Sequence, residues 1–482
     1  MRVRTVAVLA LVSACGGCMV GPNYHRPPAP IAASYKELTG WTIALPQDGI
    51  SRGAWWSIYH DPLLDSLERQ VNINNQTVKE FEATYRNSVA LVREAQANLY
   101  PTLGVDTSVT HFNSHSSSGF SNSSTGGSFG RNPTQYVLEG TADWAPDVWG
   151  KIRREVESQT AFAQVSAADL ANAQLSAQAT LATDYFNLRA QDSLQLLLQQ
   201  TAAAFQRALQ ITENQYRAGT ISRADVVTAQ AQLQSVVAQL AGVGVLRAQF
   251  EHAIAMLTGH TPDQLSIPFS SLPQTVPVVP PGIPSTLLER RPDIAAAERA
   301  MQEENAAIGV AVAAYYPTIS LSALAGFTGG PIGQLFNTAN RVWSLGAAAI
   351  QTLFEGGLRP AQVEAARATY DQAVATYRQT VLTAFQQVED ELAALRIFQQ
   401  QAAAWVVAIR AAQAAVTVAL NEYRAGTVSY TTVITEQETL LSDQQSALTV
   451  QQNRFVASVA LVEALGGGWT TGELPTQAVI RN

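Results

Sequence analysis

The feature that most constrains this chain is an internal duplication. Within 482 residues, four short landmarks occur twice in the same order, at offsets of 206 to 216 residues. A period this long exceeds that of solenoid repeats and predicts a duplicated half-molecule. The paired landmarks are Tyr100-Pro101-Thr102 with Tyr316-Pro317-Thr318, Gly150-Lys151-Ile152-Arg153 with Gly356-Gly357-Leu358-Arg359, Tyr216-Arg217-Ala218-Gly219-Thr220 with Tyr423-Arg424-Ala425-Gly426-Thr427, and Leu257-Thr258-Gly259 with Leu465-Gly466-Gly467.

Each half contains stretches that predict long helices. Residues 62–98 and 292–314 are rich in Ala, Glu, Gln and Arg and nearly free of Gly and Pro, which favours helix. The stretches 151–217 and 359–424 also have scarcely a Gly or Pro, and each would be roughly 100 Å long as a helix. Helices in globular proteins average about 11–12 residues, so we expect a helical tube rather than a compact core.

Turn residues end both of the longest helices. Gly219 and Gly426 suit a left-handed helix cap. Ser222 and Ser429 are placed to cap the N-terminus of the next helix, with Asp225 as the reciprocal acid of a capping box in the first repeat. We therefore predict one long helical hairpin with a tight tip in each half.

Between these helices the sequence alternates with a period of two, which predicts strands. Apolar side chains recur at every second position after Pro101 and after Pro317, and the even offset of 216 residues keeps the same parity in both repeats. Each strand has about ten residues, enough to cross a bilayer when tilted. The predicted strands are about 101–111, 135–145, 317–328 and 341–353.

Aromatic residues gather at the strand ends nearest the long helices. They suit an interfacial aromatic girdle, although ordinary core packing explains them equally well. The Ser/Gly/Asn-rich segment 111–133 and the shorter segment 329–340 are predicted hairpin loops, and His111 and His115 are interpreted as loop residues rather than metal ligands. The aromatic residues are Tyr100, Trp144, Trp149, Tyr315 and Tyr316.

Four strands cannot close a barrel, and open sheet edges are not tolerated in lipid. Several copies must therefore share one wall, and three copies would supply twelve strands, a number that leaves room for a lumen. The duplication thus predicts an α+β membrane protein that assembles as a homotrimer. Its β-barrel would be continuous with an α-helical coiled-coil barrel.

The N-terminal segment predicts export and lipid attachment. Arg2 and Arg4 precede a short apolar run, which is typical of a secretory signal peptide at 1–17 and too short to span a bilayer. Small residues precede both cysteines of the chain, as in a bacterial lipobox. Cys18 is the favoured acylation site and Cys15 the alternative, and several acyl chains on one cysteine would anchor the chain stably.

The composition argues against several classes of function. Only 14% of the residues are charged, the formal net charge is −8 and there are three lysines, so no basic surface favours nucleic acid. The adjacent carboxylates Glu303 and Glu304 would point in different directions on a helix, and no nucleophile motif accompanies them. We expect no enzymatic activity, no cofactor and no metal site.

Several segments resemble the TolC-like outer membrane factors, specifically the lipoprotein branch of the NodT/OprM type. The resemblance covers nearly the whole chain, and the start after Cys18 is typical of that branch. The segments that carry it are Val20-Gly21-Pro22-Asn23-Tyr24 with Arg26-Pro27, Arg290-Arg291-Pro292-Asp293-Ile294 with Glu298, Ala306 with Ile308-Gly309-Val310-Ala311, Phe354-Glu355-Gly356-Gly357-Leu358-Arg359, and Val381-Leu382-Thr383-Ala384-Phe385 with Val388-Glu389-Asp390.

The resemblance implies a homotrimer in the outer membrane of a Gram-negative bacterium, in contact with outer membrane lipid. A 12-stranded barrel would join a periplasmic helical tunnel, with an equatorial region near 26–53, 267–285 and 467–482. Such channels receive substrate from an inner-membrane transporter, here expected to be of the RND type, through a periplasmic adaptor that meets the hairpin tips. The adaptor-docking candidates are Arg217, Gly219, Thr220, Ser222, Arg424, Gly426, Thr427 and Ser429.

The family closes its periplasmic end with polar or acidic rings near the tips, and one known pattern there is Leu-Asp-Ala-Gln-Arg. This chain has Ile-Thr-Glu-Gln-Glu at 434–438, so Thr435 replaces the acid and Glu438 replaces the arginine. The gate candidates are therefore Asp225, Thr435, Glu436 and Glu438. Threefold symmetry would bring like charges together and raise some pKa values, although a solvated helix face explains these acids equally well.

The predicted function is the outer-membrane channel of a tripartite efflux system, including drug efflux. Type I protein secretion or metal efflux is the alternative, and a lipid-anchored coiled-coil envelope protein or adhesin is a more distant one. The predicted organisation is a signal peptide at 1–17, an anchor and equatorial segment at 18–60, repeats at 61–266 and 286–466 with helical hairpins at 151–258 and 358–465, a Pro-rich equatorial linker at 267–285 and an equatorial tail at 467–482.

Overall fold

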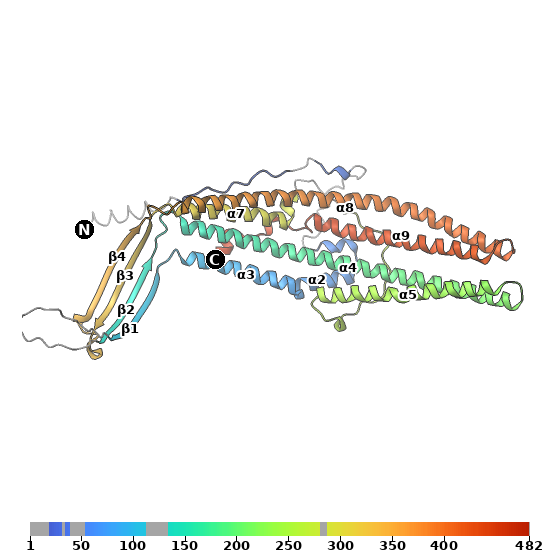
Figure 1. The fold of residues 1–482 in the computed structure, drawn as a ribbon, viewed down its shortest axis with the longest axis horizontal. Helices are drawn as coiled ribbons and strands as arrows, with labels where there is room; N and C mark the ends of the chain where they lie inside the picture. Colours follow the sequence, from blue (N-terminus) through green and yellow to red (C-terminus); the bar gives the residue numbers. More distant parts are fainter. Residues whose placement is uncertain (1–18, 31–33, 39–53, 112–133, 280–286, 482) are drawn as a thin grey trace, which may run out of the picture.

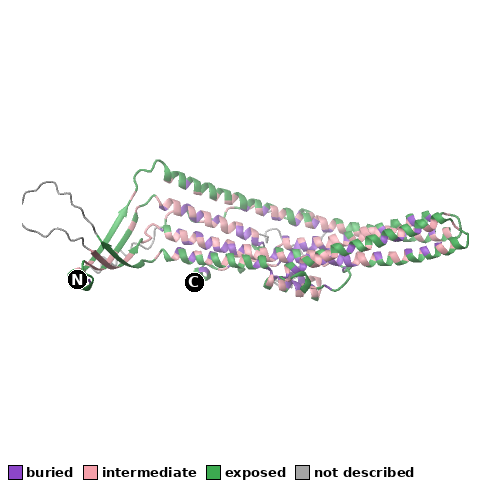
Figure 2. Cartoon of the chain, turned by 60° about the horizontal axis from the view of Figure 1, so that its bottom comes forward, coloured by how far each residue is buried: buried purple, intermediate pink, exposed green. Residues whose placement is uncertain are grey.

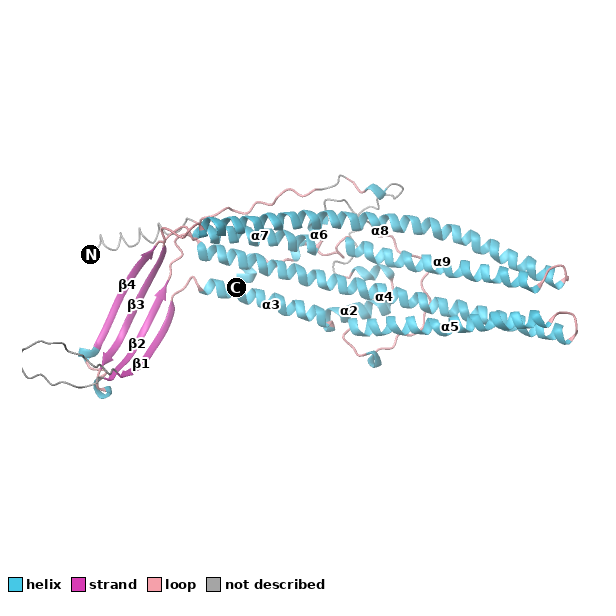
Figure 3. Cartoon of the chain, viewed as in Figure 1, coloured by secondary structure: helices cyan, strands magenta, loops and turns pink. Residues whose placement is uncertain are grey.

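The computed structural model describes residues 19–30, 34–38, 54–111, 134–279 and 287–481. Over these ranges the chain is elongated, with a sheet at one end and long helices along the rest (Figures 1 and 3). The strands are β1 (Thr102–His111), β2 (Thr134–Trp144), β3 (Thr318–Gly329) and β4 (Arg341–Ile350), and the α-helices are α2 (Pro62–Asn74), α3 (Gln76–Ala97), α4 (Lys151–Arg217), α5 (Arg223–Leu257), α6 (Leu287–Arg290), α7 (Pro292–Ala313), α8 (Leu358–Arg424), α9 (Tyr430–Ala464) and α10 (Gln477–Arg481).

The four strands form one antiparallel sheet in the order β1-β2-β3-β4. Leu103 pairs with Ala142, which in turn pairs with Ala323 of the second repeat, and directly paired side chains share a face. That face is therefore apolar across the repeats, whereas the opposite face holds the direct pair Asp106 and Glu139. The strand parity predicted from the sequence is confirmed, and the sheet has one apolar and one polar face, as a barrel wall requires.

The last strand is shorter than the sequence predicts. A strand to residue 353 was expected, but β4 ends at Ile350, whose ladder partner is Thr318. The residue before Thr318 is Pro317, which has no N–H with which to extend the ladder. The prediction for 351–353 is therefore wrong, and Leu353 is 93% exposed.

The helix predicted over 62–98 is interrupted. Asn75 has extended ψ (126°) and separates α2 from α3. Its side-chain oxygen accepts a hydrogen bond of 3.1 Å from the backbone N–H of Val78 and so caps α3. Asparagine is a favoured N-cap residue because its side chain satisfies a helix donor that has no partner in the helix. The prediction of one continuous helix here is wrong.

The two longest helices match the prediction. α4 and α8 each have 67 residues and lie side by side with the shorter helices (Figure 1). α3 and α5 follow one another along α4, and α7 and α9 follow one another between α4 and α8. The helical part therefore has two successive four-helix layers that share α4 and α8, one layer toward the sheet and one toward the tips.

Buried side chains concentrate inside the helical part, while the sheet and the outer helix faces are exposed (Figure 2). The largest apolar cluster lies in the middle of the bundle and includes the stacked rings of Phe186 and Phe455, whose centroids are 4.6 Å apart. A second cluster lies nearer the tips and includes Leu233, Val433 and Tyr430. The largest core thus lies where the two layers meet, and the layer toward the tips has a second core of its own.

A buried ionic network fixes the first part of the linker between the repeats. Asp192, which is fully buried, accepts hydrogen bonds from Arg189 at 3.2 Å and from Arg247 at 2.7 Å. The same arginines donate to the backbone carbonyls of Pro268 and Ile267, at 2.6 and 2.8 Å. Because all of these charges are paired and bonded to backbone, their burial is tolerated, and the linker is held against α4 and α5.

The aromatic residues at the base of the strands are mostly not core residues. Tyr100 is 69% exposed, Trp144 is 38% exposed and Tyr316 is 39% exposed. Trp149 is half-buried, stacks on Tyr316 with centroids 5.0 Å apart and donates from Nε1 to the carbonyl of Pro317 at 2.8 Å. The exposure favours the interfacial-girdle interpretation over core packing, with Trp149 joining the start of α4 to that of β3.

Candidate functional site

The tip of the first helical hairpin is built as the sequence predicts. Gly219 has φ +73° and lets the chain leave α4, while the N–H and the hydroxyl of Thr220 both donate to the carbonyl of Gln215, at 3.0 and 2.9 Å. Ser222 then caps α5 in a capping box with Asp225, whose carboxylate accepts from the Ser222 N–H at 3.1 Å. Hydrogen bonds within the tip thus hold both the turn and the start of α5.

The second tip shares the turn but not the cap. Gly426 has φ +75°, and Thr427 makes the same two hydrogen bonds, here to the carbonyl of Glu422 at 3.0 and 2.9 Å. The side chain of Ser429 makes no capping bond to α9, and its hydroxyl lies 3.5 Å from that of Thr432. Ser429 therefore occupies the predicted N-cap position, but the predicted side-chain cap is absent, and Thr432 stands where the first repeat has an acid.

The two tips are joined within one chain. The hydroxyl of Tyr423 on α8 donates to the side-chain oxygen of Gln215 on α4 at 3.0 Å. The rings of Tyr423 and Tyr430 are 5.2 Å apart, and Tyr430 is only 5% exposed. Burial raises the pKa of both tyrosines, and the nearby charge of Asp225 raises it further. The tips therefore form one unit rather than two independent loops.

The adaptor-docking candidates lie at the far end of this unit. All eight are exposed, and the side chain of Arg217 is 71% exposed with a loose ion pair of 3.8 Å to Glu213. An exposed pair of this length contributes little to stability. The arginines at the tips are therefore free to bind a partner at little cost to the fold.

The gate candidates do not form a cluster within one chain. Asp225 is held at the start of α5 by its capping box, whereas the other three lie in the second and third turns of α9. Thr435 donates to the carbonyl of Thr431 in its own helix at 3.1 Å, Glu436 is half-buried and Glu438 is exposed. Across the described ranges, neither of these glutamates makes an ion pair or a hydrogen bond. Asp225 is explained by helix capping.

Acidic residues on the polar face of the sheet were missed in the sequence. Asp106 lies directly opposite Glu139, and Asp143 lies opposite Thr102 on the same face. Glu139 also accepts a hydrogen bond of 3.3 Å from the hydroxyl of Thr328. In a closed barrel this face lines the lumen. The signal was present, because these acids occupy the polar positions of the alternating pattern.

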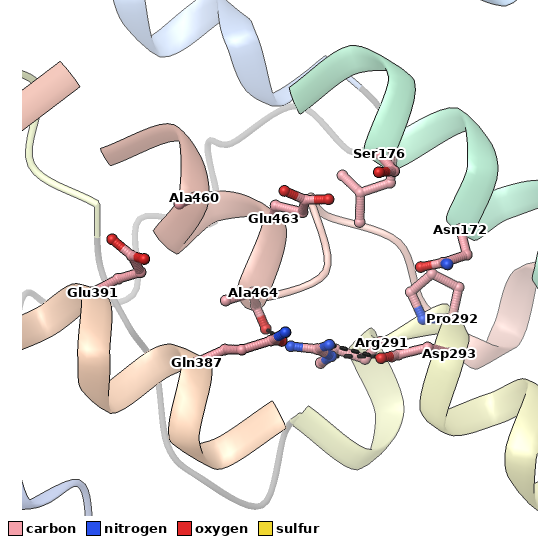
Figure 4. Close-up of a pocket in the computed structure, with 11 residues that line it drawn as sticks. Asn172, Ser176, Arg291, Pro292, Asp293, Gln387, Glu391, Ala460, Glu463 and Ala464 are labelled. Atoms are coloured by element: carbon pink, nitrogen blue, oxygen red, sulfur yellow. Dashed lines mark hydrogen bonds and ion pairs between the residues drawn. The ribbon is translucent and has the colours of Figure 1, made fainter. Parts of the chain in front are cut away.

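A cavity of about 320 Å³ lies where α7 and α9 meet, and Figure 4 shows the side chains that surround it. Arg291, 8% exposed, donates to the backbone carbonyl of Ala464 at 2.9 Å and to Asp293 at 2.6 and 3.0 Å. Burial raises the pKa of the two glutamates here, Glu391 and Glu463. The cavity is polar, and Arg291 connects the start of α7 to the end of α9.

Two parts of the predicted site lie outside the described residues: the acylation candidates Cys15 and Cys18, and the loop residue His115. Over the ranges that the structure does describe, no three His, Cys, Asp or Glu side chains are grouped so that they could hold a metal ion.

Comparisons with known proteins agree along the chain. A family model described as "Outer membrane efflux protein" matches residues 67–260 and 283–467. The solvent efflux pump outer membrane protein SrpC of Pseudomonas putida is 30% identical over 484 residues, covering 98% of this chain and 100% of that protein. The antibiotic efflux pump outer membrane protein ArpC of Pseudomonas putida is 29% identical over 480 residues, with 99% and 98% covered. The solved outer-membrane channel OprN is 28% identical, with a TM-score of 0.85, over 94% of this chain and 100% of that chain.

Proposed function

Because this chain belongs to the outer membrane efflux protein family, we propose that three copies of it form the exit duct of a tripartite pump, with a periplasmic adaptor at the hairpin tips and an inner-membrane transporter of the RND type. The chain is an outer-membrane efflux channel subunit with the TolC-like fold. The family is one of channels rather than enzymes, and its membership argues against an adhesin or an envelope spacer.

The observation that carries the proposal is that the four-stranded sheet has two open edges, one from each repeat. β1 and β4 are the edge strands of the sheet. On the β1 side of the molecule the outer helices are α3, which leads into β1, and α5, which lies beyond it toward the tips. On the β4 side the outer helix is α8 (Figure 1). Unpaired strand edges must be closed in lipid, so β4 and α8 of one copy would meet β1, α3 and α5 of the next.

The exposed face of α8 supports this closure. Among the described helices, α8 is the one that is long and apolar enough to cross a membrane by length and composition, and only 11% of its most apolar segment is buried. Side chains such as Ile397, Val407 and Val418 are 50%, 65% and 54% exposed. An apolar surface of this extent on a helix that is continuous with the bundle is typical of a subunit interface.

The finer assignments are proposals. Cys18 would carry the lipid anchor, and the eight tip residues would contact the adaptor. Antibiotics and solvents are the proposed substrates, because the relatives ArpC and SrpC belong to an antibiotic efflux pump and a solvent efflux pump. The gate would lie near Glu436 and Glu438, which point in different directions on α9 because they are two residues apart. In a trimer, whichever of the two faces the axis would form a ring of three carboxylates.

The test is deletion of the gene in its host and complementation, with a susceptibility panel of antibiotics, solvents, dyes and metal salts. We expect increased susceptibility to organic compounds, restored by the wild-type chain. Susceptibility to metal salts alone would support metal efflux, and loss of a secreted protein would support type I secretion. The purified protein should be a trimer that conducts ions in planar bilayers; a non-conducting monomer in mild detergent would overturn the channel.

A further inference from the structure

A second cavity, of about 580 Å³, lies between the end of α3, the first turns of α4, α10 and the N-terminal segment. Its wall combines three arginines with apolar groups. The residues that matter here are Arg153, Arg154 and Arg481 on the charged side and Met19, Leu99 and Tyr100 on the apolar side. A wall of this kind suits a ligand with an anionic head and an apolar body.

The cavity opens at the level where the helices meet the strands. Tyr100 is two residues before the start of β1, and Trp144, the last residue of β2, donates from Nε1 to the carbonyl of Leu99 at 2.9 Å. If the strands span the outer membrane, as the proposed function requires, this level is the surface of the leaflet that faces the periplasm. Phospholipid phosphates lie at such a surface, and aromatic residues favour it.

One of the three arginines is already fully used. Arg154 is 1% exposed and donates to Glu157 at 2.7 Å, to the carbonyls of Val20 and Gly21 at 3.1 and 3.2 Å and to Asn23 at 2.9 Å. These bonds tie the N-terminal segment to α4. The role of Arg154 is therefore structural, and its charge is balanced by Glu157.

The other two arginines keep free donors. Arg153 uses Nε and one terminal nitrogen on Asp147, at 3.1 Å each, and its side chain is 34% exposed. Arg481 is exposed and, within the described part of the chain, makes no hydrogen bond or ion pair. Guanidinium groups bind phosphate through paired N–H donors.

The apolar side of the cavity distinguishes a lipid from a free anion. The side chain of Tyr100 is 69% exposed and that of Met19 is 37% exposed. A free phosphate gains nothing from such groups, whereas the glycerol and first methylenes of a phospholipid would bury them, which is favourable. Anionic lipid and surface arginines also attract each other electrostatically.

We propose that this cavity binds the headgroup of an anionic phospholipid of the periplasmic leaflet, with Arg153 and Arg481 donating to its phosphate and Tyr100 covering its glycerol region. The lipid would hold α10 and the end of α3 against the membrane surface. This inference rests on the proposed placement of the strands in the outer membrane.

Native mass spectrometry of the full-length protein in mild detergent tests the proposal. The probes are phosphatidylglycerol, phosphatidylcholine and inorganic phosphate. We expect phosphatidylglycerol to remain bound, and Arg481→Gln to weaken its binding about tenfold, as loss of a charge-assisted hydrogen bond predicts. Arg69→Gln, which removes an exposed arginine on α2 away from the cavity, should leave binding unchanged.

Other outcomes overturn the site. Equal retention of phosphatidylglycerol by wild type and Arg481→Gln, equal binding of phosphatidylcholine, or saturation by inorganic phosphate would each exclude it. If Arg481→Gln assembles poorly, Arg153→Gln tests the same site independently. The mass of the assembly and its conductance are measured on the same samples, so failure of the channel assignment is distinguished from failure of the lipid site.

Discussion

The side-chain amide of Asn75 donates a hydrogen bond of 2.8 Å to the backbone carbonyl of Leu257, which joins the start of α3 to the end of α5. The second repeat makes the same joint with a different side chain, since Arg291 donates to the carbonyl of Ala464 at 2.9 Å. Both bonds satisfy a carbonyl at a helix C-terminus that has no partner in its own helix. The duplicated architecture thus keeps the joint while its chemistry differs.

Asn75→Ala should loosen the joint of the first repeat. The change removes the bond to Leu257 and the cap on Val78, and Asn75 is only 5% exposed. A lost cap costs about 1 kcal/mol and an unpaired buried carbonyl about 1–3 kcal/mol, so the melting temperature of the purified protein should fall. Thr77→Ala, an exposed change two residues away, is the control; an equal fall in both variants would count against the joint.

Arg291→Lys should weaken the corresponding joint of the second repeat. Arg291 bonds Ala464 and Asp293 at once, and an ammonium group cannot reproduce this fork geometry. We expect a lower melting temperature, by an amount equivalent to about 1–3 kcal/mol. The matched control is Arg290→Lys, because Arg290 precedes it and is exposed. A variant as stable as the control would show that this fork is dispensable.

Neutralising the acids on the polar face of the sheet should alter the ion selectivity of the channel. Asp106 and Glu139 face each other on that face, and threefold assembly would repeat the pair around the lumen. The acids should attract cations into the pore, so Asp106→Asn with Glu139→Gln should lower the cation preference of the wild type. Reversal potentials in planar bilayers under a salt gradient measure it. Thr107→Ala, on the apolar face, should change nothing.

Reversing the charge of the tip arginines should impair export without unfolding the chain. Arg217 and Arg424 are exposed and make no close ion pair among the described residues. If the adaptor binds there, Arg217→Glu with Arg424→Glu should restore little resistance in a deletion strain, while assembly and conductance stay normal. Arg69→Glu serves as the control for charge reversal. Full complementation by the double variant would exclude the arginines from docking.

The sequence was most informative where local chemistry determines structure. Strand parity, the glycine turns at Gly219 and Gly426 and the lengths of α4 and α8 all follow from periodicity and turn residues. The break at Asn75 had a local signal, because asparagine is a favoured N-cap residue, but the bond to the carbonyl of Leu257, which is far away in sequence, could not be predicted. Ser429 lies at the predicted N-cap position, but its side chain does not cap α9, and Thr432 lacks the carboxylate that completes the capping box in the first repeat.

The site was predictable to a lesser degree. The acids of the strands occupy the polar positions of the alternating pattern, but only the register shows that Asp106 faces Glu139. Arg481 lies near the C-terminus of the sequence and Arg153 in the first repeat, and only the fold brings both to one cavity. Contacts between residues distant in sequence therefore limit what can be predicted about the site, because neither helix and strand propensity nor residue spacing specifies such contacts.

A buried acid on α2 should make the stability of the chain depend on pH. Glu68 is fully buried, and neither of its carboxylate oxygens has a hydrogen-bond partner among the described residues. Burial raises its pKa well above the ordinary value of 4.5, and the charge of Asp65 raises it further; Tyr59 is the other titratable group that faces it. An acid with a raised pKa binds its proton more tightly in the folded chain than in the unfolded one.

Stability from Glu68 is fully present below pH 4.5 and is lost as the pH rises from there toward the raised pKa. Glu68→Gln, which is neutral at every pH, should therefore raise the melting temperature at pH 8 and leave it nearly unchanged at pH 4. Glu80→Gln, an exposed change on α3, should shift neither. If the Glu68→Gln curve runs parallel to the wild-type curve from pH 4 to 8, this glutamate is ionised in the folded protein and must be paired there by a neighbouring copy.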